Sequence, residues 1–298
     1  MRKIRATCFA TFVALAVCLG CGAPSLPAPR DTKHGGIVTF GPNLTETVFA
    51  LGQGDRIVGI TSFCDYPPEA LSKERLGGYL DPNLERIAVL RPSLLILPGR
   101  HEKLSELAKQ YNIPILNAHM DNMESIHTSI VNIGEALECP DKATALWNSI
   151  TVQLDTIREK VGGKPRPKVL LINTRTNHDL NNLFSVGKSS FLAELTDVAG
   201  GENIFNDVND PYFEASKETI VMRAPDVIVE FHSGEPLTPE QQAEFVADWN
   251  ELPSLPAVQN KRVYLFMESY GLRPGPRIAL TARKLAEMLH PGIELPAP

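Results

Sequence analysis

The sequence is poor in cysteine and in basic charge. Of its 5 cysteines, Cys8, Cys18 and Cys21 lie close to the N-terminus, which leaves Cys64 and Cys139 for the rest of the 298 residues. This excludes a small fold held by disulfides. An oxidising compartment would permit a Cys64–Cys139 bridge, but two lone cysteines do not establish one. With 29 basic against 35 acidic residues, nucleic acid and anionic lipid are disfavoured as partners.

The motifs of common enzyme classes are also missing. Gly187-Lys188-Ser189 ends like a phosphate-binding loop, but that motif needs a glycine where Asn182 stands. There is no G-x-S-x-G and no H-E-x-x-H, and acids and histidines are not paired by spacing. We therefore expect neither enzymatic activity nor a cofactor, and a secreted enzyme is kept only as a minor alternative.

One long apolar run is present, at the N-terminus. Three basic residues precede the run over residues 6–19, which is the layout of a secretory signal and is too short for a comfortable membrane span. A glycine and then Cys21 follow, as in the bacterial lipoprotein signal, so we expect residues 1–21 to be such a signal and Cys21 to be lipidated. Ordinary cleavage or a retained anchor is the alternative. The Pro-, Ala- and Gly-rich residues 22–35 indicate a flexible tether.

One segment occurs twice, as NLERIAVLRPSLLIL from Asn83 and as SKETIVMRAPDVIV from Ser216. Each copy begins with a helix-capping residue and has a glutamate in the first turn, where the helix dipole favours negative charge. A proline then ends the helix before an apolar strand. A first-turn glutamate is more often an ordinary surface residue, but its recurrence indicates two similar lobes that present Glu85 and Glu218.

The remaining chain alternates short apolar strands with helices, which predicts an α/β fold with a mostly parallel sheet. The exception is residues 140–161, where apolar residues recur every three or four positions without a strand. We predict lobes over residues 36–139 and 163–298, joined by a bridging helix over residues 140–162. This helix is expected to be a rigid strut that holds two separately folded halves apart. A crossover helix inside one larger sheet is the alternative.

Five segments resemble periplasmic substrate-binding proteins of ABC importers, in the group that carries cobalamin, ferric siderophores and haem. The segments are DYPPEA, NLERIAVLRP, GGENIF, SKETIVMRAPDVIV and RPGPRIAL, and they are most similar to the cobalamin-binding members. The resemblance implies two Rossmann-like lobes joined by a single long helix, with the ligand in the cleft between them. It also implies a monomeric periplasmic or cell-surface lipoprotein that delivers its ligand to a permease with a separate ATPase. Glu85 and Glu218 would then engage arginines of the permease.

The ligand-binding residues are expected among aromatic side chains, because a large flat chelate needs aromatic faces and a few convergent polar groups. The positions that match the cleft of cobalamin binders are all expected in loops: Phe63, Tyr66, Tyr79, Tyr212, Tyr270 and Arg273. Tyrosine stands at three of these positions where the best-known cobalamin binder has tryptophan. Haem is therefore kept as an alternative, with Tyr79 as its axial ligand through the phenolate, and a ferric siderophore after it. Arg273 would meet a carboxylate, phosphate or propionate of the ligand.

Three histidines, His101, His119 and His232, each end or follow an apolar strand. Histidines in such places would suit a free-metal site. There is no histidine-rich loop and the spacing is not that of a metal motif, so we expect satisfied loop histidines and no bound metal.

Overall fold

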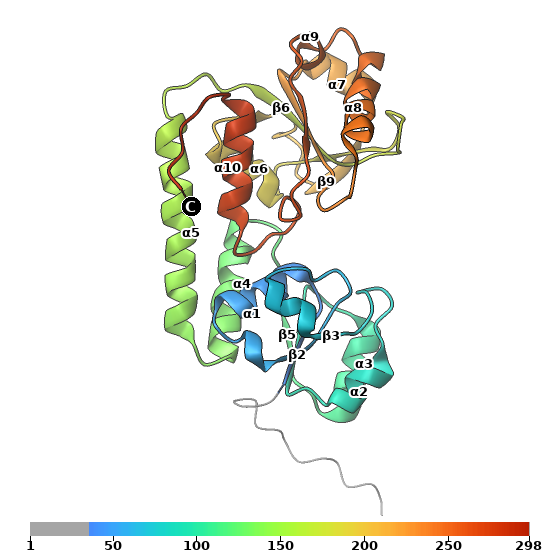
Figure 1. Ribbon diagram of the computed structural model, residues 1–298, viewed down its shortest axis with the longest axis vertical. Helices are drawn as coiled ribbons and strands as arrows, with labels where there is room; N and C mark the ends of the chain where they lie inside the picture. Colours follow the sequence, from blue (N-terminus) through green and yellow to red (C-terminus); the bar gives the residue numbers. More distant parts are fainter. Residues whose placement is uncertain (1–35, 298) are drawn as a thin grey trace, which may run out of the picture.

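The computed structural model describes residues 36–297, which form two lobes connected along one side by a long helix (Figure 1). The N-terminal lobe is built on a parallel five-stranded sheet in the order β3-β2-β1-β4-β5. Its elements are β1 (Ile37–Thr39), α1 (Pro42–Ala50), β2 (Ile57–Ile60), β3 (Glu74–Arg75), α2 (Leu84–Leu90), β4 (Leu94–Leu97), α3 (Glu102–Tyr111), β5 (Ile115–Asn117) and α4 (Met123–Ala136). The predicted signal, the lipidation at Cys21 and the tether lie outside the described residues.

The C-terminal lobe has a six-stranded sheet in the order β11-β10-β6-β7-β9, with β8 paired to β6. Its elements are β6 (Lys168–Thr174), β7 (Leu183–Val186), α6 (Phe191–Val198), β8 (Glu202–Asn203), β9 (Tyr212–Ala215), α7 (Lys217–Arg223), β10 (Val227–Phe231), α8 (Pro239–Asp248), α9 (Pro256–Gln259), β11 (Val263–Phe266) and α10 (Ile278–Leu289). The α/β class and the two-lobed fold are confirmed.

Three strands of this sheet, β7, β8 and β9, were not predicted. β7 runs antiparallel to both β6 and β9, because a polar hairpin, rather than a crossover helix, connects β6 to β7. Tyr212 consequently opens strand β9, and its predicted place in a loop is wrong. The helix expected from Lys188 begins only at Phe191, since the side chain of Ser190 caps it by accepting a hydrogen bond from the Leu192 amide at 3.3 Å.

The long helix α5 (Pro140–Val161) has 22 residues and leads from one lobe to the other (Figure 1). The helix begins at Pro140 and is followed by Gly162. Proline is favoured at the first position of a helix and glycine just after its end. Within residues 36–297 no helix has the combined length and apolarity to span a membrane. Cys139, which precedes α5, and Cys64 are both buried free thiols, so they form no disulfide.

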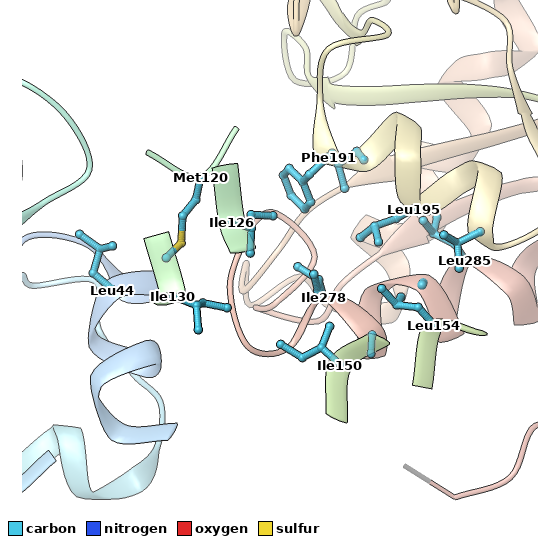
Figure 2. Close-up of a cluster of buried hydrophobic side chains, with 14 of the residues drawn as sticks. Leu44, Met120, Ile126, Ile130, Ile150, Leu154, Phe191, Leu195, Ile278 and Leu285 are labelled. Carbon is cyan, nitrogen blue, oxygen red and sulfur yellow. The ribbon is translucent and has the colours of Figure 1, made fainter. Parts of the chain in front are cut away.

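A single apolar cluster joins the two lobes beside α5. Figure 2 shows side chains of α1, α4, α5, α6 and α10 meeting in it, with Leu44 and Ile130 toward one lobe, Ile278 between, and Leu195 and Leu285 toward the other. All of these side chains are fully buried. The expectation of separately folded halves held apart is therefore wrong on this side of the molecule. The bridging helix needs partners for its apolar stripe, and α4 and α10 supply them.

The C-terminal lobe also buries a charged network at the end of β10. Glu230 accepts hydrogen bonds from the Arg175 Nε at 2.8 Å, the His232 Nε2 at 2.8 Å and the Trp249 Nε1 at 2.9 Å. Burial opposes the ionisation of Glu230, but the His232 hydrogen bond and the Arg175 charge outweigh it and lower its pKa. Burial likewise opposes the charging of His232, yet hydrogen bonds to Glu230 and Glu235 raise its pKa.

This network predicts a stability maximum at mildly acidic pH. The stabilisation through Glu230 is complete above its ordinary pKa of 4.5 and is lost as the pH falls through the lowered folded value. The stabilisation through His232 is complete below its ordinary pKa of 6.5 and is lost as the pH rises through the raised folded value. We expect the free energy of unfolding, measured with urea, to be highest between pH 4.5 and pH 6.5, where both contributions are complete. His232→Gln should remove the decline on the alkaline side, and an unchanged alkaline decline in this variant would contradict the assignment.

Candidate ligand-binding site at the lobe boundary

The repeated segment forms the short helices α2 and α7, with the same local construction in both lobes. The Asn83 side chain accepts a hydrogen bond from the Arg86 amide at 3.0 Å, and Ser216 Oγ accepts one from the Thr219 amide at 3.2 Å. Each helix ends in a left-handed residue directly before its proline. These caps fix the first turn, so the carboxylates of Glu85 and Glu218 are exposed at matching positions of the two lobes.

The basic residues beside these two glutamates are already paired with other acids. Arg86 pairs with Glu74 at 2.5 Å, and Lys217 pairs with Glu251 at 2.5 Å. Neither repeat glutamate forms an ion pair with another described residue. Hydrogen bonds with the backbone amide of Glu218 itself and with the Ser216 side chain lower the pKa of Glu218. Each lobe therefore presents an exposed carboxylate in the first turn of its repeat helix.

Phe63 and Tyr66 lie in the loop after β2, and their side chains are 68% and 44% exposed. Among the described residues only Phe184 and Tyr212 are other aromatic side chains with comparable exposure, at 39% each. The Phe63 ring faces the turn that carries Tyr79, since a Cβ added at Gly78 would lie 3.6 Å from it. Phe63 and Tyr66 thus expose apolar rings beside the contact that Arg273 makes between the lobes, and exposed apolar area of this kind is typical of binding surfaces.

Tyr79 is held in place by its neighbours in the N-terminal lobe. Its hydroxyl donates to the Arg100 carbonyl at 3.3 Å, and its ring meets His101 edge-on at 4.9 Å. Because His101 Nδ1 accepts the Leu104 amide, its Nε2 carries the proton and donates to the Tyr79 carbonyl at 2.7 Å. Both nitrogens of His101 are thereby used, so this histidine orients Tyr79.

Tyr212 borders the same boundary from the C-terminal lobe. Its ring is partly exposed while its hydroxyl is enclosed and accepts a hydrogen bond from Ser190 at 3.3 Å. Burial raises the pKa of this hydroxyl, and the charge of Asp121 in the N-terminal lobe raises it further. The Asp121 carbonyl also accepts the Phe191 amide at 2.8 Å, so the two lobes touch beside Tyr212.

Tyr270 and Arg273 lie in the segment between β11 and α10, where C-terminal-lobe residues reach the N-terminal lobe. The Arg273 guanidinium bonds Asp65 and reaches Glu46 of α1 at 3.3 Å. Burial disfavours the charge of Arg273, but these carboxylates outweigh that effect and raise its pKa. The same hydrogen bond from Arg273 lowers the pKa of Asp65.

Arg277 completes this contact between the lobes. It forms a two-pronged ion pair with Glu46, with Nε–Oε2 at 2.8 Å and Nη2–Oε1 at 2.6 Å. Its guanidinium also lies 4.1 Å from the Tyr66 ring centre and 5.3 Å from that of Tyr270. Part of the aromatic surface expected to stack on a ligand thus faces an arginine of the same chain.

Two cavities involve residues of both lobes, and neither contains the whole predicted site. One of about 340 Å³ lies at the boundary, lined by residues that include Phe49, Tyr66 and Arg277. This is near the lower limit for drug-sized ligands, so it is too small for a whole metal chelate. A larger one of about 570 Å³ lies between the start of α4, α5 and α6, around Trp147 and Lys188, and includes none of the predicted ligand residues.

The other candidate residues have structural partners. His232 belongs to the buried network of Glu230. The backbone carbonyl of His119 accepts a hydrogen bond from the Ser129 hydroxyl. No group of three or more metal-ligating side chains occurs within residues 36–297.

Sequence reasoning missed Glu46, Asp65 and Arg277. Glu46 is only 3% exposed although it is charged. It lies between Thr45 and Thr47 in α1, so no apolar pattern marked it as buried. Sequence reasoning also missed Leu80, which is 87% exposed in the turn after Tyr79.

Two α/β lobes, one bridging helix and exposed aromatic residues at their boundary define a two-lobed binding protein. The chain belongs to the periplasmic binding protein family, whose profile matches residues 37–270. Members of this family are substrate-binding proteins, not enzymes.

Relatives and solved structures agree with this membership. The "Vitamin B12-binding protein" of Salmonella typhimurium (strain LT2) is 28% identical over 256 residues, which cover 85% of this chain and 89% of the relative. That of Yersinia pestis (strain Pestoides F) is 27% identical over 267 residues, 89% of each chain. The crystal structure of the periplasmic vitamin B12 binding protein BtuF of Vibrio cholerae superimposes with a TM-score of 0.69 at 22% identity, over 86% of this chain and 97% of that one. The periplasmic heme-binding protein RhuT from Roseiflexus sp. RS-1 gives 0.71 at 21% identity, over 87% and 99%.

Proposed function

We propose that this protein is the extracytoplasmic solute-binding component of an ABC importer and that it binds cobalamin or a related corrinoid. The family membership supports the role, and the vitamin B12-binding relatives, which match over most of their length, support the ligand. The observation that carries the proposal is the position of the exposed aromatics. Three of the four, Phe63, Tyr66 and Tyr212, lie beside contacts between the lobes.

The proposed binding mode follows from this placement. The flat corrin ring would be enclosed between the loops of the two lobes, against the faces of Phe63, Tyr79 and Tyr212. Tyr66 and Tyr270 would complete the site from the contact between the lobes, where Arg273 is paired with Asp65. The shared apolar cluster and the single stiff helix α5 limit the relative motion of the lobes, so closure on the ligand would be modest.

Delivery would use the two repeat glutamates. Glu85 and Glu218 would engage basic residues of the permease, one from each lobe, and ATP would be hydrolysed by a separate subunit. An exposed apolar side chain follows each glutamate by one helical turn, Val89 at 66% and Met222 at 76% exposure. This would add an apolar contact to each ion pair. The protein would be a monomer without catalytic activity, anchored to the membrane through lipid on Cys21.

Haem is the second candidate, and Tyr79 is the observation that favours it. Its side chain is half-buried and fixed by Arg100 and His101, as the protein ligand of a ferric haem would need to be. Solved haem-binding proteins share the fold. A ferric siderophore follows as a third candidate.

Isothermal titration calorimetry with cobalamin, cobinamide and haem tests the proposal directly. We expect saturable binding of one corrinoid per chain and an unmodified ligand after incubation, because members of this family are substrate-binding proteins. The visible absorption spectrum of the protein as purified reports any ligand retained from the cell. Binding of haem alone would replace the corrinoid with the second candidate, and conversion of the ligand to a product would overturn the binding role.

A further inference from the structure

The contact between the lobes contains three charged side chains that are largely out of water. Glu46 and Arg277 have side chains that are 2% and 12% exposed, and Arg273 is 16% exposed. A charge so far out of water is destabilising unless its hydrogen bonds are satisfied. Here they are satisfied across the boundary, by partners that come from opposite lobes.

We propose that Arg273 and Arg277 are positioning residues for ligand binding and do not contact the ligand themselves. Arg273 binds Asp65, whereas Arg277 binds Glu46 and packs against Tyr66. Together these contacts hold residues 63–66 of the N-terminal lobe in the orientation in which Phe63 and Tyr66 would contact the ligand. This inference rests on the proposed function, since it assigns how the same site is shaped.

The geometry at Arg273 gives the first reason. Its guanidinium meets both oxygens of Asp65 and approaches the Phe63 carbonyl at 3.5 Å. One arginine of the C-terminal lobe therefore fixes the loop of the N-terminal lobe that carries an exposed ring. Both terminal nitrogens of Arg273 already meet oxygens of this chain, so a ligand anion would compete with the Asp65 carboxylate for them.

The geometry at Arg277 gives the second reason. Two of its nitrogens are taken by Glu46 of α1, and Tyr66 lies 4.1 Å from its guanidinium. Arginine suits such a place because its flat group can form a forked ion pair and pack against a ring together. The orientation of Tyr66 is thus coupled to α1 and to the start of α10.

The first experiment compares Arg273→Gln with Asp65→Asn by calorimetry against cobalamin and cobinamide. Cobinamide lacks the nucleotide phosphate, which is the group that a ligand-contacting arginine would bind. Positioning predicts that both variants lose about tenfold in affinity, a change of 1.4 kcal/mol, and that they lose it equally for both corrinoids. A loss confined to cobalamin, or an affinity kept or raised by Asp65→Asn, would show direct contact and overturn the proposal.

The second experiment measures the geometry without ligand. Spin labels at Lys103→Cys and Glu244→Cys, exposed positions on α3 and α8, report the distance between the lobes by double electron–electron resonance. We expect Glu46→Gln and Arg277→Lys to broaden this distribution, and the double variant Glu46→Gln/Arg277→Gln, which removes both charges, to recover part of it. Arg158→Gln, which breaks an exposed ion pair within α5, is the matched control.

These two measurements separate the possible failures. An unchanged distance distribution in the Glu46 and Arg277 variants, each shown to be folded by its thermal melting, would overturn the positioning role. If the wild type binds neither corrinoid, the proposed ligand is wrong, while the distance measurement still decides whether the contact sets the angle between the lobes.

Discussion

The double charge reversal Glu85→Lys/Glu218→Lys is expected to reduce transport by about 100-fold or more while leaving ligand affinity unchanged. Like charges brought together at an interface cost several kcal/mol, and each 1.4 kcal/mol is a factor of ten. Both glutamates are exposed on short helices of different lobes, so neither substitution disturbs packing. Uptake of labelled cobalamin by cells that lack their own binding protein gives the transport rate, and calorimetry on the purified variant gives the affinity.

The chain offers matched controls for this reversal. Glu240 lies in the first turn of α8, and its pKa is lowered by its own helix amide and by the capping side chain Thr238, as that of Glu218 is by Ser216. Glu102 occupies the first turn of α3 and is the counterpart for Glu85. Glu102→Lys/Glu240→Lys adds the same positive charge at helix starts outside the repeat. If it lowers uptake equally, or if the repeat variant transports normally, a specific docking role for the two glutamates is wrong.

Tyr212→Ala is expected to weaken corrinoid binding by about 30-fold. An aromatic residue at the centre of an interface contributes about 2 kcal/mol, which corresponds to that factor. Its exposed ring and enclosed hydroxyl leave the face of the ring for the ligand, since Ser190 holds the other end. Tyr212→Phe keeps the ring and should retain most of the affinity. Calorimetry with cobalamin measures both variants.

Phe184→Ala is the matched control for this substitution. Phe184 is as exposed as Tyr212, at 39%, and lies on the neighbouring strand β7, where it pairs with Glu214. It removes a similarly exposed aromatic ring from the same sheet, at a residue that the proposed binding mode does not use. Equal losses of affinity in the two variants would mean that the sheet, rather than a stacking contact, determines binding. A Tyr212→Ala protein with full affinity would remove this residue from the site.

Within the proposed site, the sequence predicted the exposed aromatic residues but not the side chains that pack against them. The aromatic residues at 63, 66 and 212 are exposed at the boundary, as a stacking site requires. Tyr66 nevertheless packs against Arg277, and Arg273 meets carboxylates of its own chain. The two ends of the Arg277–Glu46 pair are separated by 231 positions, and no local pattern records such a partner.

The sequence by itself determined the elements that depend on nearby residues. Asn83 and Ser216 cap the two repeat helices because a side-chain oxygen accepts an amide only three positions away. The apolar stripe over Pro140–Val161 specified one helix because helical periodicity is a local property.

Only the tertiary structure decided how these elements meet. It joined both lobes in one apolar cluster, returned the chain antiparallel at β7, and buried Glu46 against two arginines. The physical reason is that burial and ion pairing depend on which surfaces come together after the helices and strands have formed. The spacing of residues along the chain specifies those helices and strands but not the surfaces they bury.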